Sequence, residues 1–173
     1  MPLHPPSVPG ASVVFTVALA DRSLQFLAEE VTTLRDAVRI IRTERPFRID
    51  AWVVLPDQMH AVWTLPETDA DCSVRWKDIK TRFTKSGGKT GRRSASRIAK
   101  REAGIWQRRF WEHHIRDERD FTTPLRSRWW NPVKHGYVER AVDWPYAPLH
   151  REIRLGQVEP EWAGTGIIGK FGE

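Results

Sequence analysis

Gln58 and His60 stand two residues apart in a segment, Gln58 to Leu65, that is typical of a β-strand. Side chains alternate between the two faces of a strand, so both residues are expected on the same face. Two side chains with lone pairs at this spacing can share one divalent metal ion. A single histidine on a strand is more often only hydrogen-bonded, so the pair is weak evidence for a metal site.

Other combinations of reactive residues give weaker evidence for a metal or catalytic site than this pair. His113 and His114 are adjacent and would face opposite sides of a strand, which makes them a poor chelating pair. We find no serine–histidine–aspartate pattern, phosphate-binding glycine loop or close carboxylate pair. The single cysteine, Cys72, excludes an internal disulfide and a zinc site with several cysteines, which suits a reducing compartment.

Positive charge is concentrated in one segment. The chain has 28 Lys and Arg against 22 Asp and Glu, a net charge of +6 and a pI near 9.9. The segment from Arg75 to Arg109 has thirteen basic and two acidic residues, so it carries +11 and the rest of the chain sums to −5. This asymmetry favours a polyanionic partner, most often nucleic acid. The ordinary alternative is a solvated basic face without a ligand.

Aromatic residues interleave with these cations. Trp106 and Trp111 flank Arg108 and Arg109, and aromatic rings beside arginine can stack on unpaired bases. The ordinary alternative for the two arginines is a surface ion pair with nearby acidic residues such as Glu112.

Hydrophobic periodicity and turn residues predict the elements that position these groups. Pro56-Asp57 is expected to join two strands as a hairpin. Pro124 falls inside a helix, where we expect it to kink or break the element at a cost of about 3 kcal/mol. Pro132 to Tyr137 is expected to be a turn. Strands are expected over 12–19, 47–55 and 58–65, and helices over 23–45, 72–85 and 117–130. Residues 105–116 are expected to be a fourth strand or an extended segment with a strand at its end.

This order predicts an α+β fold, a sandwich of an antiparallel sheet with helices on one face. The 173 residues suit one domain over 11–150 with a flexible basic loop at 86–104. We expect an extended N-terminal arm over 1–10 and an irregular C-terminal tail over 151–173. The longest apolar stretch, 11–20, is about half a bilayer span, so we expect no membrane helix or signal peptide.

Five ordered blocks of sequence are recognisable. They are AWVVLPDQMHAVWTLP (51–66), RWKDIKTRF (75–83), IWQRRFWEHHIRDERDF (105–121), NPVKHG (131–136) and DWPYAPLHR (143–151). Together they resemble the REP-associated tyrosine transposases, relatives of the insertion-sequence single-strand transposases with a His-hydrophobic-His motif. The resemblance runs from about residue 10 to 164.

The resemblance implies a ferredoxin-like sandwich that binds repetitive extragenic palindromes as single-stranded hairpins and cuts or rejoins the adjoining strand. It implies a tyrosine nucleophile on the helix before the NP motif. It also implies Mg²⁺ or Mn²⁺ held by two histidines and a polar side chain of that helix.

The chain departs from this pattern at two positions. His60 matches the second motif histidine, but the first falls on Gln58, and the nucleophile position is Ser127. Asn131 matches the third metal ligand. A site made of Gln58, His60 and Asn131 has one strong ligand, so we expect weak metal binding. A serine hydroxyl lies close to the backbone and needs a general base, and Tyr137 is an unfavoured replacement.

We therefore favour a hairpin-binding protein with impaired catalysis, and leave its status as an enzyme open. The alternatives are an active transposase that uses another nucleophile such as Tyr137, and a generic basic nucleic-acid-binding protein. Nothing in the sequence decides the oligomeric state; we expect a monomer at the nucleoid in a bacterial cytoplasm. DNA contacts are assigned to Arg75, Lys77, Lys80, Arg82, Arg92, Arg93, Arg108 and Arg109, with Trp106 and Trp111 as stacking platforms.

Overall fold

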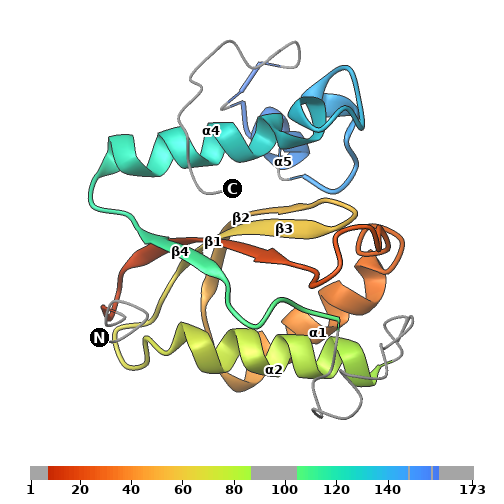
Figure 1. Ribbon diagram of the computed structural model, residues 1–173. Helices are drawn as coiled ribbons and strands as arrows, with labels where there is room; N and C mark the ends of the chain where they lie inside the picture. Colours follow the sequence, from red (N-terminus) through yellow and green to blue (C-terminus); the bar gives the residue numbers. More distant parts are fainter. Residues whose placement is uncertain (1–7, 87–104, 148, 157, 160–173) are drawn as a thin grey trace.

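Four antiparallel strands form one sheet in the order β2-β3-β1-β4 in a computed structural model (Figure 1). The structure describes residues 8–86, 105–147, 149–156 and 158–159, without the side chains of 122–125. The strands are β1 (Ser12–Ala18), β2 (Arg48–Val54), β3 (Gln58–Thr64) and β4 (Trp111–His114). Strands β2 and β4 are therefore the edges of the sheet, and β1 and β3 lie inside it.

Two helices cover one face of the sheet: α1 (Val31–Glu44) and α2 (Cys72–Lys85) (Figure 1). The Asp71 carboxylate caps α2 by accepting a hydrogen bond from the Val74 N–H at 3.0 Å. Alternate residues of the inner strands, among them Phe15 and Trp63, pack with Trp76 of α2 in the larger hydrophobic core. This layer is the helix-covered antiparallel sheet that the sequence predicts, and the predicted α+β class is confirmed.

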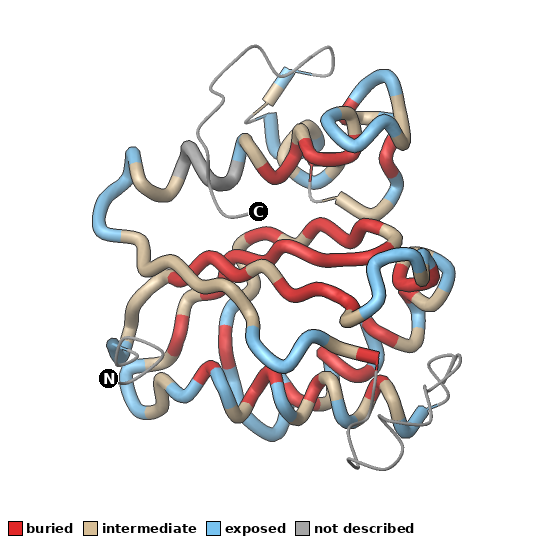
Figure 2. The backbone as a smooth tube through the Cα atoms, viewed as in Figure 1, coloured by how far each residue is buried: buried red, intermediate tan, exposed pale blue. Residues whose placement is uncertain are grey.

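A third helix, α4 (Glu118–Lys134), lies over the other face with α5 (Leu149–Arg154) and the 3-10 turn η1 (Ala141–Asp143) (Figure 1). Helices therefore cover both faces of the sheet, whereas the sequence predicted them on one face. Val53, Leu55 and Trp129 form a smaller core there, and the buried residues among the described side chains of α4 lie in its C-terminal half (Figure 2). The sheet thus separates two different helical layers.

The β2–β3 hairpin forms as expected around Pro56-Asp57. The Leu55 N–H donates to the Gln58 carbonyl at 2.8 Å, and the register pairs Val53 with His60. A shift of register between Ile49 and Ala51 makes a bulge on the edge strand. This hairpin fixes the position of Gln58 and His60 in the sheet.

Helix α1 starts at Val31, and the helix expected from Ser23 is wrong over its first eight residues. The Asp21 carboxylate accepts hydrogen bonds from Ser23 N and Oγ at 3.0 and 2.6 Å, which favours a turn. The Leu27 N–H donates to the Pro56 carbonyl at 2.9 Å, so this segment is tied to the hairpin turn instead of to a helix. Leu27 is still fully buried, which explains its apolar spacing.

Helix α4 is continuous through Pro124, so the expected break does not occur, and it extends to Lys134 through the predicted turn. Asp117 caps its start by accepting from Asp120 N at 2.8 Å. Its end is a Schellman motif at Gly136 (φ 73°), with Gly136 N–H donating to Val133 O and Tyr137 N–H to Pro132 O, both at 2.9 Å. Asn131 is therefore a helical residue.

The predicted outer segments are partly described. Residues 151–154 belong to α5 instead of an irregular tail, because Leu149 and Ile153, four residues apart, pack against the smaller core. Most of the N-terminal arm, the basic loop from 87 and the tail from 160 lie outside the described residues. Within the described part of the chain, no helix combines the length and apolar composition that crossing a bilayer requires.

Candidate functional site between β3 and helix α4

Gln58 and His60 lie on the face of the sheet that α4 covers. Both are buried, and His60 is only 3 % exposed. Its strand neighbours are Thr16 on β1 and Val53 on β2, and its Nδ1 lies 3.0 Å from Thr16 Oγ1. His60 Nε2 is buried and forms no hydrogen bond with a described residue. One nitrogen of this imidazole is therefore left unpaired among the described residues.

Helix α4 supplies the opposite wall of the site. Arg128 and Asn131 are both buried, and they lie on one side of the helix because residues three apart are neighbours. The pKa of His60 is lowered by the charges of Arg128 and Lys134 on α4 and of His135 at its C-cap. They bracket Asn131, so the C-terminal half of α4 lies over His60.

The site has a positive potential. Burial, followed by the charges of Arg128, His135, Arg22 and Lys134, holds the pKa of His60 well below its usual value near 6.5. The imidazole is therefore neutral at physiological pH. Burial also lowers the pKa of Arg128 to about 10, and its guanidinium carbon lies 5.7 Å from the centre of the Trp111 ring. An anion entering this region would be stabilised.

The residues fit a divalent metal ion only in part. A neutral imidazole with an open Nε2 is a suitable ligand. The other two candidates, Gln58 and Asn131, offer neutral amide oxygens, and no cluster of three His, Cys, Asp or Glu occurs in the described part of the chain. Mg²⁺ and Mn²⁺ prefer carboxylate oxygens, and the surrounding cations oppose a further positive charge. Of the three candidate side chains, only His60 is a strong ligand for such an ion.

Ser127 is placed one helical turn before Asn131 and is partly exposed. No hydrogen bond joins its hydroxyl to a histidine, aspartate or glutamate that the structure describes, so nothing there activates it. Tyr137 follows the Schellman turn, with its ring centre 5.5 Å from that of Trp144. Burial and then Asp57 raise the pKa of the Tyr137 phenol, against a smaller lowering by Arg22. Tyr137 therefore shares Arg22 as an electrostatic neighbour with His60.

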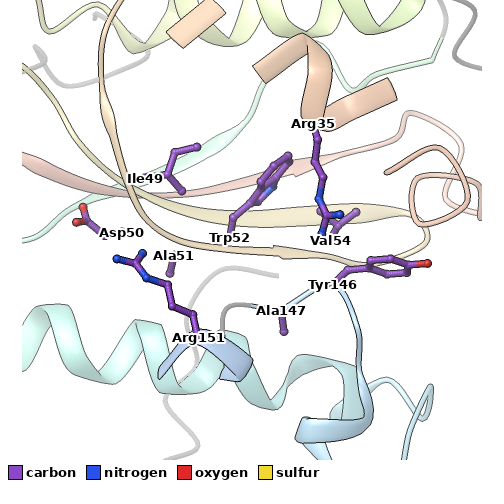
Figure 3. A pocket seen from close by; sticks show the side chains of 9 residues that line it. All are labelled: Arg35, Ile49, Asp50, Ala51, Trp52, Val54, Tyr146, Ala147 and Arg151. Atoms are coloured by element: carbon purple, nitrogen blue, oxygen red, sulfur yellow. The ribbon is translucent and has the colours of Figure 1, made fainter. Parts of the chain in front are cut away.

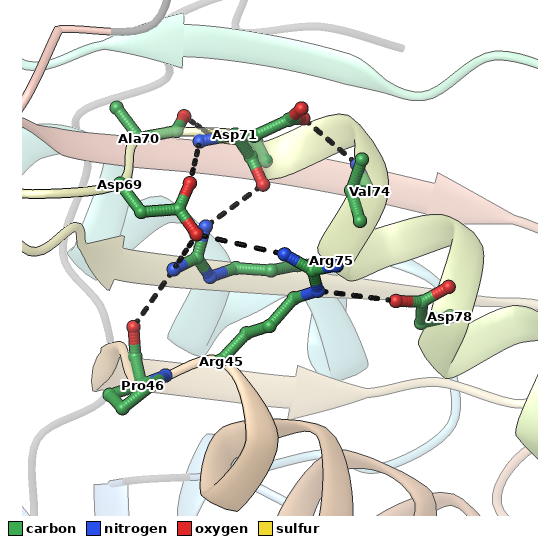
Figure 4. Close-up of polar contacts among 9 residues, drawn as sticks. Arg45, Pro46, Asp69, Ala70, Asp71, Val74, Arg75 and Asp78 are labelled. Carbon is green, nitrogen blue, oxygen red and sulfur yellow. Dashed lines mark hydrogen bonds and ion pairs between the residues drawn. The ribbon is translucent and has the colours of Figure 1, made fainter.

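Arg75 has a structural position, and the expectation that it contacts DNA is wrong. It is 1 % exposed, and its guanidinium donates to the Asp71 and Pro46 carbonyls at 3.0 and 3.1 Å (Figure 4). An ion pair with Asp69 at 3.3 Å completes its surroundings. Arg75 ties the start of α2 to the end of α1, so it is not available to a ligand.

Trp106 has a similar structural position. It packs against the larger core, with its ring centre 5.4 Å from that of Phe83 in an edge-to-face contact. Its indole N–H is buried without an acceptor in the described structure. Trp106 is therefore not an open platform for a base, whereas Trp111 lies on the α4 side, in contact with Arg128.

The remaining cations assigned to DNA lie in different places. Lys77, Lys80 and Arg82 are on α2, on the far side of the sheet from His60 (Figure 1). Lys80 Nζ donates to the Gln107 carbonyl at 3.1 Å, and Arg82 lies 3.5 Å from Glu44. Arg108 and Arg109 are exposed and form no ion pair with a described residue. Arg92 and Arg93 lie outside the described residues.

Sequence reasoning missed the cations that surround His60. These are Arg22, which pairs with Asp57 at 2.7 Å, and the α4 group of Arg128, Lys134 and His135. A signal existed for Arg128, because it stands three residues before Asn131 on a predicted helix. Arg22 gave no such signal, since its place depends on the turn that replaces the start of α1.

The chain is similar to known proteins over nearly its whole length. No family model matches the sequence. The REP-associated tyrosine transposase of Escherichia coli (strain K12) is 41% identical over 166 residues, covering 96% of this chain and 93% of that protein. A putative REP-associated tyrosine transposase of Haemophilus influenzae is 40% identical over 157 residues, 90% of this chain and 89% of that protein. A solved REP-associated tyrosine transposase bound to a REP hairpin has a TM-score of 0.84 at 38% identity, covering 99% of this chain and 94% of that one.

Proposed function

The chain belongs to the family of REP-associated tyrosine transposases, and from this premise we propose that it binds single-stranded DNA hairpins of REP type while its strand-transfer chemistry is impaired. Hairpin binding is what the solved relative does in its complex. In this chain the proposal is supported mainly by the positive region above His60, formed by Arg22, Arg128 and the C-terminal end of α4. Cations gathered on one face attract the DNA backbone whatever its sequence.

We assign the DNA-binding face to the α4 side of the sheet. Lys134 and His135 are exposed there, beside the buried Arg128 and the partly buried Trp111. The exposed Arg108 and Arg109 stand between Gln107, whose carbonyl accepts from Lys80 of α2, and Phe110, which packs with Trp76 of α2, so they lie toward the α2 side. The α2 cations, on the other side of the sheet, are a secondary surface. A hairpin would therefore lie across β4 and α4.

Strand cleavage is limited by Gln58 at the first histidine position and Ser127 at the nucleophile position. In this transposase family metal use is general; Mg²⁺ or Mn²⁺, when bound, would polarise a scissile phosphate. In this chain Gln58 and Asn131 offer only amides beside His60, so we propose weak binding of either ion. Arg128 and Lys134 can still neutralise a phosphate, but no histidine, aspartate or glutamate among the described residues is bonded to the Ser127 hydroxyl as a general base. The protein would thus bind DNA without cutting it efficiently.

Strand cleavage by Tyr137 is the second candidate function. Its phenol and His60 share Arg22 as an electrostatic neighbour, which supports a position near the bound strand. Its raised pKa opposes this role, because attack needs the phenol to lose its proton. We therefore rank Tyr137 below the binding function. The family's bacterial relatives and this ligand support action at the nucleoid.

Binding is tested by fluorescence anisotropy with a labelled REP-type stem-loop, an unpaired strand of equal composition and a linear duplex. We expect the stem-loop to bind most tightly, with a log–log salt slope of about −4 to −5 if about six phosphates are contacted. Equal affinity for all three probes would instead support a generic basic nucleic-acid-binding protein.

A matched pair of variants tests the assigned face. Lys134→Gln on α4 and Lys77→Gln on α2 each remove one exposed charge. We expect Lys134→Gln to weaken stem-loop binding and reduce the magnitude of the salt slope by about one, with Lys77→Gln close to the parent protein. The reverse result would move the interface to α2.

A further inference from the structure

A pocket of about 210 Å³ opens at the outer edge of β2, away from the residues discussed so far (Figure 3). Its floor is the edge strand itself, from Ile49 to Val54, and Tyr146 closes one end. Arg35 reaches it from α1 and Arg151 from α5, so the pocket wraps around the sheet edge between the two helical layers (Figure 3). It has room for one planar ring system with its polar substituents.

Its two arginines are free to bind a ligand. Arg35 and Arg151 are both exposed, and neither forms an ion pair or a hydrogen bond with a residue that the structure describes. The contact of Arg35 is with an aromatic ring, its guanidinium carbon lying 6.0 Å from the centre of Tyr146. Arginine is the side chain best suited to phosphate oxygens, which it can bind through two parallel N–H groups.

The one carboxylate in the pocket is already neutralised. Asp50 accepts from Arg48 Nε at 2.7 Å and from Thr64 Oγ1 at 2.6 Å. Its negative charge is therefore matched by Arg48, outside the pocket lining, and the two free arginines leave the pocket positive. An anionic ligand is favoured over a cationic one.

Aromatic surface lies beside these cations. Trp52 projects from the edge strand toward Arg35, and Tyr146 lines the same pocket (Figure 3). Tyr146 is held in place through its backbone, since its carbonyl accepts from the Val54 N–H at 3.0 Å. A ring system can stack on such side chains with little regard to which base it carries. Cations and aromatic rings together suit a ligand that is both planar and anionic.

We propose that this pocket binds a nucleoside monophosphate unit, with its phosphate on Arg35 or Arg151, which reach the pocket at opposite ends (Figure 3), and its base against Trp52 or Tyr146. The unit has two possible sources, a free nucleotide or an unpaired nucleotide of a DNA strand. The second source rests on the proposed function. It is sterically reasonable because β2 and the His60-bearing β3 are adjacent strands, about 4.8 Å apart. A strand leaving the α4 face could reach the β2 edge within a few nucleotides.

The test compares two double variants of equal charge. Arg35→Gln/Arg151→Gln removes both pocket cations; Arg39→Gln/Arg154→Gln removes two exposed arginines from the same two helices outside the pocket lining. The probes are free dTMP, a blunt-ended REP-type hairpin, and the same hairpin with a six-thymidine extension at either end. Calorimetry measures the first probe and anisotropy the other two.

We expect the pocket variant to lose dTMP binding, or to bind the extended hairpin about tenfold more weakly than the control variant. Loss with dTMP alone identifies a free nucleotide as the ligand, and loss with the extension identifies a DNA strand. Both double variants should bind the blunt hairpin equally. The proposal is overturned if the two double variants behave alike with dTMP and with the extended hairpin.

Failure of the proposed function has a different signature. A parent protein that binds neither hairpin refutes hairpin recognition, while the dTMP measurement still decides the pocket. Trp52→Leu adds a second test, because it removes the stacking surface and keeps an apolar side chain. It should weaken the same probe as the arginine variant while the melting temperature stays within a few degrees of the parent.

Discussion

Replacing Arg75 should make the protein unfold far more readily and leave its DNA affinity unchanged. The side chain is 1 % exposed and has three acceptors: the Asp71 carbonyl at 3.0 Å, the Pro46 carbonyl at 3.1 Å and the Asp69 carboxylate at 3.3 Å. Arg75→Ala leaves two carbonyls without their donor, at about 1–3 kcal/mol each. Breaking a buried charged contact typically costs about 3–5 kcal/mol in total. That is a large share of a domain stability of about 5–15 kcal/mol.

The assay is urea unfolding followed by circular dichroism, with Lys77→Ala as the control. Lys77 is exposed on the same helix, two residues along, and its removal should change the free energy of unfolding by no more than about 0.5 kcal/mol. Arg75→Lys keeps the charge but loses the forked geometry, so it should be intermediate. A loss below about 1 kcal/mol for Arg75→Ala would refute the structural role. So would a folded Arg75→Lys protein with markedly weaker hairpin binding.

Three further outcomes are expected. Pro124→Ala should raise the free energy of unfolding, by up to about 3 kcal/mol, because α4 runs through Pro124 without that residue's N–H donor; an unchanged urea midpoint would contradict this. Burial raises the pKa of Asp120, but hydrogen bonds from His113 and Arg116 outweigh the effect of burial and lower this pKa to about 2. The ionised Asp120 therefore stabilises the fold above about pH 4, and this stabilisation is lost as the pH falls toward 2. Asp120→Asn should therefore flatten the acid limb of a stability–pH curve, and a limb of parental slope would be evidence against the pairing. Ser127→Ala should leave stem-loop affinity and any residual nicking unchanged, and a loss of nicking would show that the serine acts.

Local signals were sufficient for much of the fold. Period-two alternation and the Pro56-Asp57 turn predict the β2–β3 hairpin, and the apolar spacing predicts α2 at its observed ends. The start of α1 could not be predicted in this way, because Leu24 and Leu27 keep a helical spacing while Leu27 is bonded to the hairpin turn. A tertiary hydrogen bond overrides the local pattern there.

The sequence indicates candidate members of a site but not their surroundings. Gln58, His60 and Asn131 are all buried, and charged residues on either side of Asn131 act on His60, while a metal site made of the three stays a prediction. Charge density along the chain does not point to the α4 face that we propose for DNA, because the sheet separates α2 from His60 and Arg75 is used inside the fold. Arg22 and Arg35 lie far apart in the chain from the groups they neighbour, so only the three-dimensional structure relates them to those groups.

We propose that the protein binds hairpin DNA but lacks the side chains that would cut it efficiently. The direct measurement is covalent protein–DNA adduct formation with a REP-type hairpin and Mn²⁺, comparing the parent, Tyr137→Phe and Gln58→His/Ser127→Tyr proteins by denaturing gel and mass spectrometry. We expect the parent to bind without an adduct, and the double variant to form one at residue 127. Any adduct from the parent would contradict this, with its loss in Tyr137→Phe identifying Tyr137 as the nucleophile, and so would binding without any adduct from the double variant.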